Sequence, residues 1–264
     1  MIRNLLVPFM LGTIVSFYFF PIGFTFLPMS LNSKVLLALF GACAFAFECM
    51  KSKALVLSAD VFRSALIALL FSAICYISML INDTNDTTYA TYFVSFFTWV
   101  GGAYGVVFLL KKKYGVVDIH LLSRYLLWVA VAQCISCLLI DHVPAFSAFV
   151  DTFMDIGQQS VRELNRKYSI GAALDSGGVR FAIILVVASY ELCSKVLVKK
   201  NFGNALVYIL SYFFVILVGN MISRTATVGG ALGLGYMLLY LFKLNNGVFF
   251  LIRKRGGFSG STQD

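Results

Sequence analysis

Charged residues are scarce in this chain, at 12% of its 264 residues, whereas soluble domains carry roughly 25%. Hydrophobic residues make up 60% and the mean hydropathy is +0.87, so a soluble globular domain is excluded. The sequence also lacks a P-loop and lacks a GxGxxG motif after a strand. A cytoplasmic enzyme that binds sugar nucleotides is therefore not expected.

Long apolar stretches are abundant instead, and a bilayer is crossed by about 20 such residues. We predict an all-α polytopic bundle of about eight transmembrane helices, of which the second is short. Residues 1–243 are expected to form a single transmembrane domain, and residues 244–264 a polar cytoplasmic tail. The first stretch lacks a small-residue cleavage site and is expected to stay as an uncleaved helix. The apolar stretches occupy residues about 5–27, 34–50, 61–81, 91–110, 121–140, 179–198, 204–221 and 226–242.

Basic residues orient this bundle. With the N-terminus in the cytoplasm, all but six of the 21 lysines and arginines fall on the inner side, as the positive-inside rule requires. Both termini are therefore expected in the cytoplasm. The net charge of +9 is therefore mostly a signal of topology, and no basic stripe suited to nucleic acid is visible. The outer residues are Lys34, Arg162, Arg166, Lys167, Arg180 and Arg224.

One long extracytoplasmic loop, at residues about 141–178, connects the fifth and sixth stretches. Its first part carries an apolar stripe at helical spacing, which predicts an amphipathic helix on the outer leaflet. A capping helix that only packs against the bundle is the alternative. The stripe consists of Phe146, Phe149, Val150, Phe153, Val161 and Leu164, with Asp151, Asp155, Gln158 and Gln159 between them.

The second part of the loop is basic. Arg162 and Arg166 are four residues apart and share a face if the segment is helical. Arg180 follows in the first turn of the next span, where a helix N-terminus beside guanidinium groups favours an anion. Phosphate binding is one interpretation of this cluster. Headgroup anchoring with internal ion pairs, such as Asp175 with Arg180, is the other.

Arg224 lies in the short connection between the last two apolar stretches. A charged side chain within a membrane costs roughly 2.5–3.5 kcal/mol on insertion scales, so by default it marks a functional site. The preceding Ser223 can contact a ligand through its hydroxyl or can cap the helix that follows.

Two segments of the chain resemble a family of membrane enzymes. The run from Arg166 to Gly177 has the Arg-x10-Gly spacing of the periplasmic loop in O-antigen polymerases, and the run from Gly178 to Ala182 looks like the entry to the next helix. The run from Asn220 to Ala226, with Ser-Arg-Thr at its centre, resembles a segment shared by O-antigen polymerases and O-antigen ligases. The resemblance covers residues about 140–242.

The resemblance implies a metal-independent, inverting glycosyltransferase in the bacterial cytoplasmic (inner) membrane. It would polymerise oligosaccharide repeat units, carried on undecaprenyl pyrophosphate, into O antigen of lipopolysaccharide or a related surface polysaccharide. By the same resemblance Arg166, Arg180 and Arg224 would be the catalytic clamp on the pyrophosphate. The further candidates for substrate binding are Arg162, Lys167, Tyr168, Gly177, which would shape the loop, and Ser223.

Two other functions remain open. An O-antigen ligase is the nearest rival, and a transporter or flippase of lipid-linked oligosaccharides would bind the same pyrophosphate, although no inverted repeat is visible. Members of the family are usually longer, so the chain is either truncated relative to them or a compact variant. The expected partners are the lipid-linked oligosaccharide, the bilayer and a chain-length regulator protein. No cofactor is expected, and His120 and His142 cannot share a metal site, because they are expected at opposite membrane faces.

Overall fold

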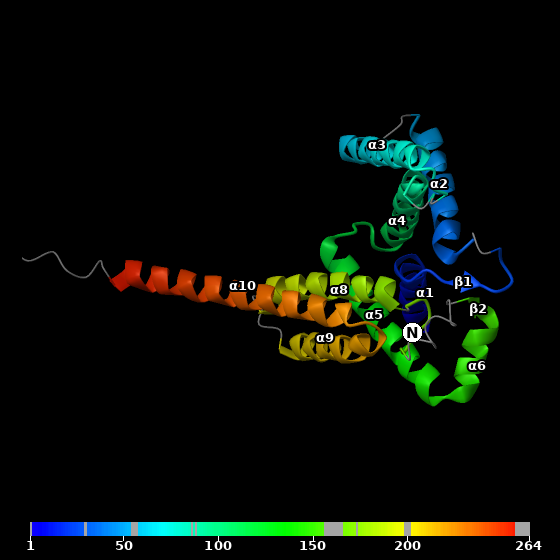
Figure 1. Cartoon of the computed structure of the whole chain (residues 1–264). Helices are drawn as coiled ribbons and strands as arrows, with labels where there is room; N and C mark the ends of the chain where they lie inside the picture. The colour runs from blue at the N-terminus through cyan, green and yellow to red at the C-terminus, as the bar shows by residue number, and fades with distance from the viewer. Residues whose placement is uncertain are drawn as a thin grey trace, which may run out of the picture. The chain divides into compact units, whose positions relative to one another are not determined.

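The computed structural model describes residues 2–28, 31–53, 58–85, 87, 89–155, 166–172, 174–197 and 202–256. Seven of the described helices are long and apolar enough to cross a membrane, which confirms the predicted all-α multi-pass bundle. A further apolar helix segment, Leu6–Phe19, is shorter. The chain folds as two compact units, Met1–Asp118 with Ala148–Ile156, and Ile119–Ser147 with Gly157–Asp264 (Figure 1).

The described residues of the first unit form four complete helices and the end of a fifth. Its first helix is shorter than the predicted stretch at residues 5–27, because Phe20 precedes Pro21 and a residue before proline disfavours the helical conformation. The second helix, predicted as short, has 20 residues and is capped by the Asn32 side chain. These helices are α1 (Ile2–Phe19), α2 (Ser33–Ser52), α3 (Ala59–Ile81) and α4 (Tyr92–Tyr114).

The predicted amphipathic helix is present but ends earlier than its apolar stripe. It forms α6 (Pro144–Phe153), which begins in the second unit and ends in the first. The chain then continues as strand β2 (Met154–Asp155), which pairs antiparallel with β1 (Gly23–Phe24). This backbone pairing, which the sequence did not predict, replaces the next helical turn. The later part of the stripe, at residues 156–165, lies outside the described residues.

Small residues bring α2 and α4 into close contact. A Cβ atom on Gly41 would overlap the carbonyl oxygen of Gly101, and one on Gly105 would lie 3.0 Å from the carbonyl oxygen of Leu37. Such spacing of small residues lets helix backbones approach closely in a membrane.

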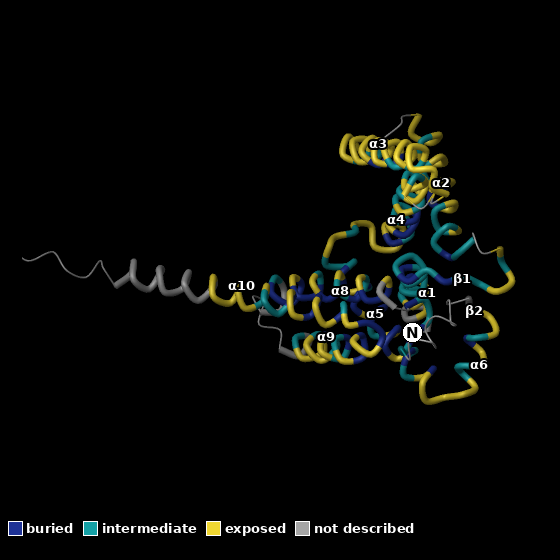
Figure 2. The backbone as a smooth tube through the Cα atoms, in the orientation of Figure 1, coloured by how far each residue is buried: buried dark blue, intermediate teal, exposed yellow. Residues whose placement is uncertain are grey.

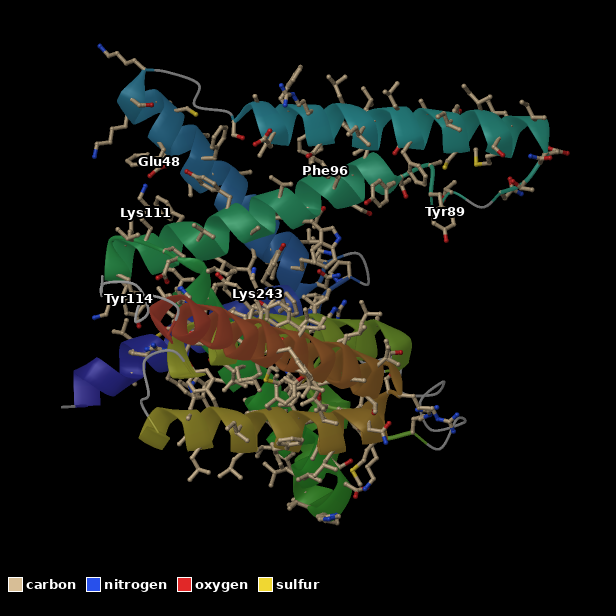
Figure 3. The ribbon with its side chains drawn as sticks, turned by 90° about the vertical axis from the view of Figure 1, so that its left-hand side faces the viewer. Glu48, Tyr89, Phe96, Lys111, Tyr114 and Lys243 are labelled. Atoms are coloured by element: carbon tan, nitrogen blue, oxygen red, sulfur yellow. The ribbon has the colours of Figure 1, made fainter. Side chains whose placement is uncertain are left out.

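The two ends of the α2 and α4 pair differ in their polar residues. Figure 3 shows Glu48, Lys111 and Tyr114 toward one end and Tyr89 toward the other. At the first end the hydroxyl of Tyr104 donates a hydrogen bond to the carboxylate of Glu48. This end carries the basic run at Lys111, as expected for a cytoplasmic end.

The second unit is a helical bundle with buried residues on several helices, and Figure 2 shows buried stretches in dark blue on α5 and α8. Large apolar side chains such as Leu217 and Leu239 are exposed on its outside, where a bilayer would cover them. The last helix continues beyond the predicted stretch at residues 226–242 and ends at Gly256. The helices are α5 (Ile119–His142), α8 (Leu174–Glu191), the π-helix η1 (Leu192–Leu197), α9 (Phe202–Ile222) and α10 (Thr225–Gly256).

The helices α8 and α10 run parallel. Gly178 of α8 packs against Ser223 just before α10, and further along Ala182 packs against Gly229. Past these contacts, the ring centroids of Tyr190 and Tyr236 are 6.5 Å apart. The order of contacts fixes the relative direction of the two helices.

We predict that Gly229→Val will lower the free energy of unfolding by about 1–3 kcal/mol, the usual effect of overpacking. A Cβ atom at Gly229 would overlap Ala182, so the valine must push α8 and α10 apart. Unfolding of the purified protein in detergent measures the effect. Gly235→Val is the matched control on the same helix, because nothing lies within 4 Å of a Cβ atom built there. Equal stability of the two variants would contradict the close packing.

Candidate functional site

One end of the second unit holds two of the segments that the sequence singled out. Gly178, in the first part of α8, is buried so closely against Ser223 that a Cβ atom would overlap the serine side chain, and it would lie 3.0 Å from the Cβ atom of Thr225. The first turns of α8 therefore meet the connection between α9 and α10. This contact brings the segments of Arg180 and Arg224 to the same end of the bundle.

Arg180 is half-buried on α8 and contacts the turn that precedes this helix. Its Nη1 donates a hydrogen bond to the carbonyl oxygen of Gly171, at 3.4 Å. Gly171 has a φ of 84°, a left-handed conformation that favours glycine. A Cβ atom on Gly177 would lie 3.2 Å from the backbone of Ala172, so the glycine lets this turn lie against the start of α8.

The residues before this turn contact the end of α5. Lys167 forms an ion pair with Asp141, whose carboxylate also lies 3.2 Å from Nδ1 of His142. Tyr168 is buried and Arg166 is half-buried. Lys167 is therefore already neutralised, and its carboxylate partner attaches the loop to α5.

Lys167 has a carboxylate partner, and the arginines differ from it in this respect. Among the described residues, no carboxylate forms an ion pair with Arg166, Arg180 or Arg224. The side chain of Asp175, the alternative partner of Arg180, lies outside the described residues, as does Arg162. A guanidinium group without a described carboxylate partner favours an anion, and arginine binds phosphate oxygens in a bidentate manner.

Ser223 and Arg224 differ in exposure. Ser223 is buried, and its Oγ accepts a hydrogen bond from the backbone nitrogen of Thr225 at 3.4 Å. This is the helix-boundary role that the sequence left open for it. Arg224 is exposed in the turn that follows, so its side chain is accessible to a ligand at this end of the unit.

The opposite end of the second unit holds a buried acidic residue that sequence reasoning did not pair. Glu191 is 2% exposed, and its carboxylate is within hydrogen-bond distance of Nδ1 of His120. The ring of Tyr190 stacks on the imidazole, with 6.2 Å between centroids and 14° between planes. The π-helix η1 begins directly after Glu191, and such segments are frequent at functional sites. The sequence alone indicated this pairing only in that it places His120 and Glu191 near the same, inner membrane face.

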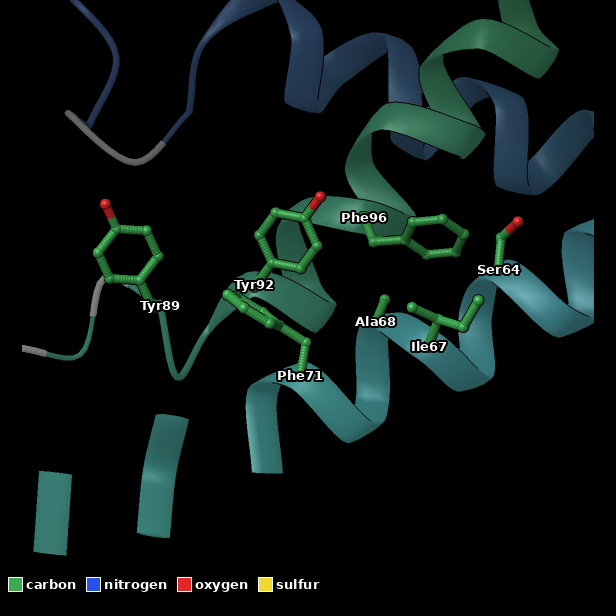
Figure 4. A pocket seen from close by; sticks show the side chains of 7 residues that line it. All are labelled: Ser64, Ile67, Ala68, Phe71, Tyr89, Tyr92 and Phe96. Carbon is green, nitrogen blue, oxygen red and sulfur yellow. The ribbon is translucent and has the colours of Figure 1, made fainter. Parts of the chain in front are cut away.

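A separate pocket of about 450 Å³ lies in the first unit, between α3 and α4 (Figure 4). The rings of Phe71 and Tyr92 form one wall, with 5.2 Å between their centroids. None of its described lining residues is charged, so this described lining is not suited to an anion. Its lining residues are Ser64, Ile67, Ala68, Phe71, Tyr89, Tyr92 and Phe96.

The fold defines the chain as a multi-pass membrane protein. Comparison with family models, with curated proteins and with solved structures gave no match. An assignment of function therefore rests on the chain's own segments and on the geometry of their packing.

The orientation of the bundle is a prediction of the positive-inside rule. Reporter fusions at Lys112, Gln158, Lys200 and Asp264 should read inside, outside, inside and inside. A cytoplasmic signal at Gln158 would move the arginine segments to the cytoplasmic face and contradict an extracytoplasmic site.

Proposed function

We propose that this chain is a membrane glycosyltransferase that polymerises oligosaccharide repeat units carried on undecaprenyl pyrophosphate. The product would be O antigen or a related surface polysaccharide, made at the outer face of the bacterial cytoplasmic membrane. The observation that carries the proposal is the packing of Gly178 against Ser223 and Thr225. A clamp on one pyrophosphate requires that the segments of Arg180 and Arg224 meet, and this contact supports that requirement.

The chemistry explains why arginines are needed. A hydroxyl oxygen of the acceptor unit bonds to the anomeric carbon of the donor from the face opposite the leaving group. The bond from that carbon to the pyrophosphate oxygen breaks, undecaprenyl pyrophosphate leaves with the electron pair, and the hydroxyl proton is released to water. Negative charge therefore grows on the pyrophosphate in the transition state. Guanidinium groups that are held in place beforehand stabilise this charge most effectively where water is excluded.

The surroundings of each arginine suggest its role. Arg180 is half-buried and directed by the Gly171 carbonyl, so we assign it to the pyrophosphate oxygens that become charged. Arg224 is exposed beside the same end of α8, and Arg166 would approach from the loop. Lys167 is paired with Asp141, and we assign this pair to holding the loop on α5.

The test is reconstitution of the purified protein in liposomes with undecaprenyl-pyrophosphate-linked repeat units. A polymerase yields a ladder of glycans and releases one undecaprenyl pyrophosphate for each new linkage. A ligase yields a product only when lipid A core is supplied as acceptor. A transporter moves the lipid-linked units across the liposome membrane without releasing undecaprenyl pyrophosphate. Either of the last two results would replace the proposed function.

A further inference from the structure

Gln133, in the middle of α5, is a buried amide within a membrane-spanning helix. It is 4% exposed, and its Oε1 accepts a hydrogen bond of 2.6 Å from Oγ of Ser169, which is itself 0% exposed. A buried amide or hydroxyl is costly without such a partner, and polar residues inside a membrane usually serve a function. The contact joins α5 to the turn that precedes α8.

This turn, Ser169–Ala172, is non-helical backbone whose first and last residues are fully buried. The backbone nitrogen of Ser169 donates to the carbonyl oxygen of Ala172 at 2.9 Å and closes the turn. Non-helical backbone at membrane depth is tolerated where protein encloses it or where it lines a cavity. Asp141 and Gln133, which bind Lys167 and Ser169, lie about 12 Å apart along the axis of α5. The loop therefore descends along α5 into the bundle.

The same turn contacts the candidate site. The carbonyl oxygen of Gly171 accepts the hydrogen bond from Nη1 of Arg180. On the other side, Gly177 lies against the backbone of Ala172. A continuous series of contacts thus runs from the amide of Gln133 through one turn to the guanidinium group of Arg180.

We infer that Gln133 is a positioning residue for the pyrophosphate site. It fixes the depth of the turn Ser169–Ala172, and the Gly171 carbonyl then sets the direction of the Arg180 guanidinium group. Gln133 acts through Ser169 and does not touch the ligand. The inference rests on the proposed function, because it assigns Arg180 to the pyrophosphate of the donor.

The test uses inorganic pyrophosphate, titrated calorimetrically into the full-length protein in nanodiscs. Gln133→Leu keeps a similar volume but removes the hydrogen-bond acceptor. It should weaken pyrophosphate binding about tenfold, which corresponds to the loss of one hydrogen bond that holds the site in place. If the Gln133→Leu variant does not insert into the membrane, Ser169→Ala takes its place. It removes the hydrogen-bond donor and should weaken pyrophosphate binding by the same factor. Ser123→Ala is the matched control, because this buried serine of α5 donates to the Val187 carbonyl at 3.5 Å. The Ser123→Ala variant should bind pyrophosphate with the affinity of the wild type.

A double-mutant cycle separates positioning from a general effect on stability. In an Arg180→Ala background, Gln133→Leu should cause no further loss, because both changes act through the same guanidinium group. Additive losses would overturn the inference, as would equal affinities of the wild type and Gln133→Leu. A wild-type protein that does not bind pyrophosphate would instead overturn the proposed function, and the inference with it.

Discussion

Replacing Arg180 by alanine will reduce polymer synthesis by at least about 100-fold, the usual effect of removing one preorganised charge-stabilising group from a transition state. The guanidinium group is half-buried, is directed by the carbonyl oxygen of Gly171 and has no described carboxylate partner. Under the proposed function, its loss removes the stabilisation of the leaving pyrophosphate but leaves the packing of Gly178 intact. Glycan length in cells and turnover in liposomes measure the effect, and membrane fractionation checks insertion.

Two further variants define what Arg180 contributes. Arg180→Lys keeps the charge but loses bidentate binding, so it should recover only part of the activity. Arg63→Ala is the control, because Arg63 is an exposed arginine of α3 paired with Asp60 at 3.7 Å. It should leave the polymer unchanged. A normal chain length in the Arg180→Ala variant would contradict the clamp.

Replacing His120 by alanine will destabilise the protein by about 1–3 kcal/mol, the usual effect of leaving a buried polar group without its hydrogen-bond partner. The change leaves the carboxylate of Glu191 buried without its partner, next to the start of η1. It also removes the ring that stacks on Tyr190. Unfolding in detergent, followed by circular dichroism, measures the loss.

The other histidine supplies the control for this prediction. His142 contacts Asp141 at 3.2 Å, but its side chain is 70% exposed, so His142→Ala should have a much smaller effect. Adding Glu191→Leu to His120→Ala should recover stability, because it removes the uncompensated carboxylate. Equal stability of the two single histidine variants would show that the buried pair contributes nothing.

The helices of this fold could be predicted from the sequence because apolar length alone decides which segments cross a membrane. The end of α1 depended on the local effect of Pro21, which an apolar count ignores. The two-residue strands β1 and β2 could not be predicted, since they form by pairing segments that lie far apart in the chain. The early end of α6 follows from that pairing.

The sequence could predict which segments form the candidate site, but not which side chains contact one another there. Topology alone indicates that Arg180 and Arg224 lie at one membrane face, and the packing of Gly178 agrees with that. Side-chain partners depend on tertiary contacts that one sequence does not display. Gln133 and Ser169 are 36 residues apart, and His120 and Glu191 are 71 apart. A glutamine within an apolar span was nevertheless a signal, because polar side chains there need partners.

The most direct test of the pyrophosphate clamp is a structure of the full chain in a nanodisc with undecaprenyl pyrophosphate bound. The proposed function predicts that the diphosphate contacts the guanidinium groups of Arg166, Arg180 and Arg224 at the extracytoplasmic end of α8. A diphosphate bound elsewhere, or an Arg224 side chain directed toward lipid, would contradict it.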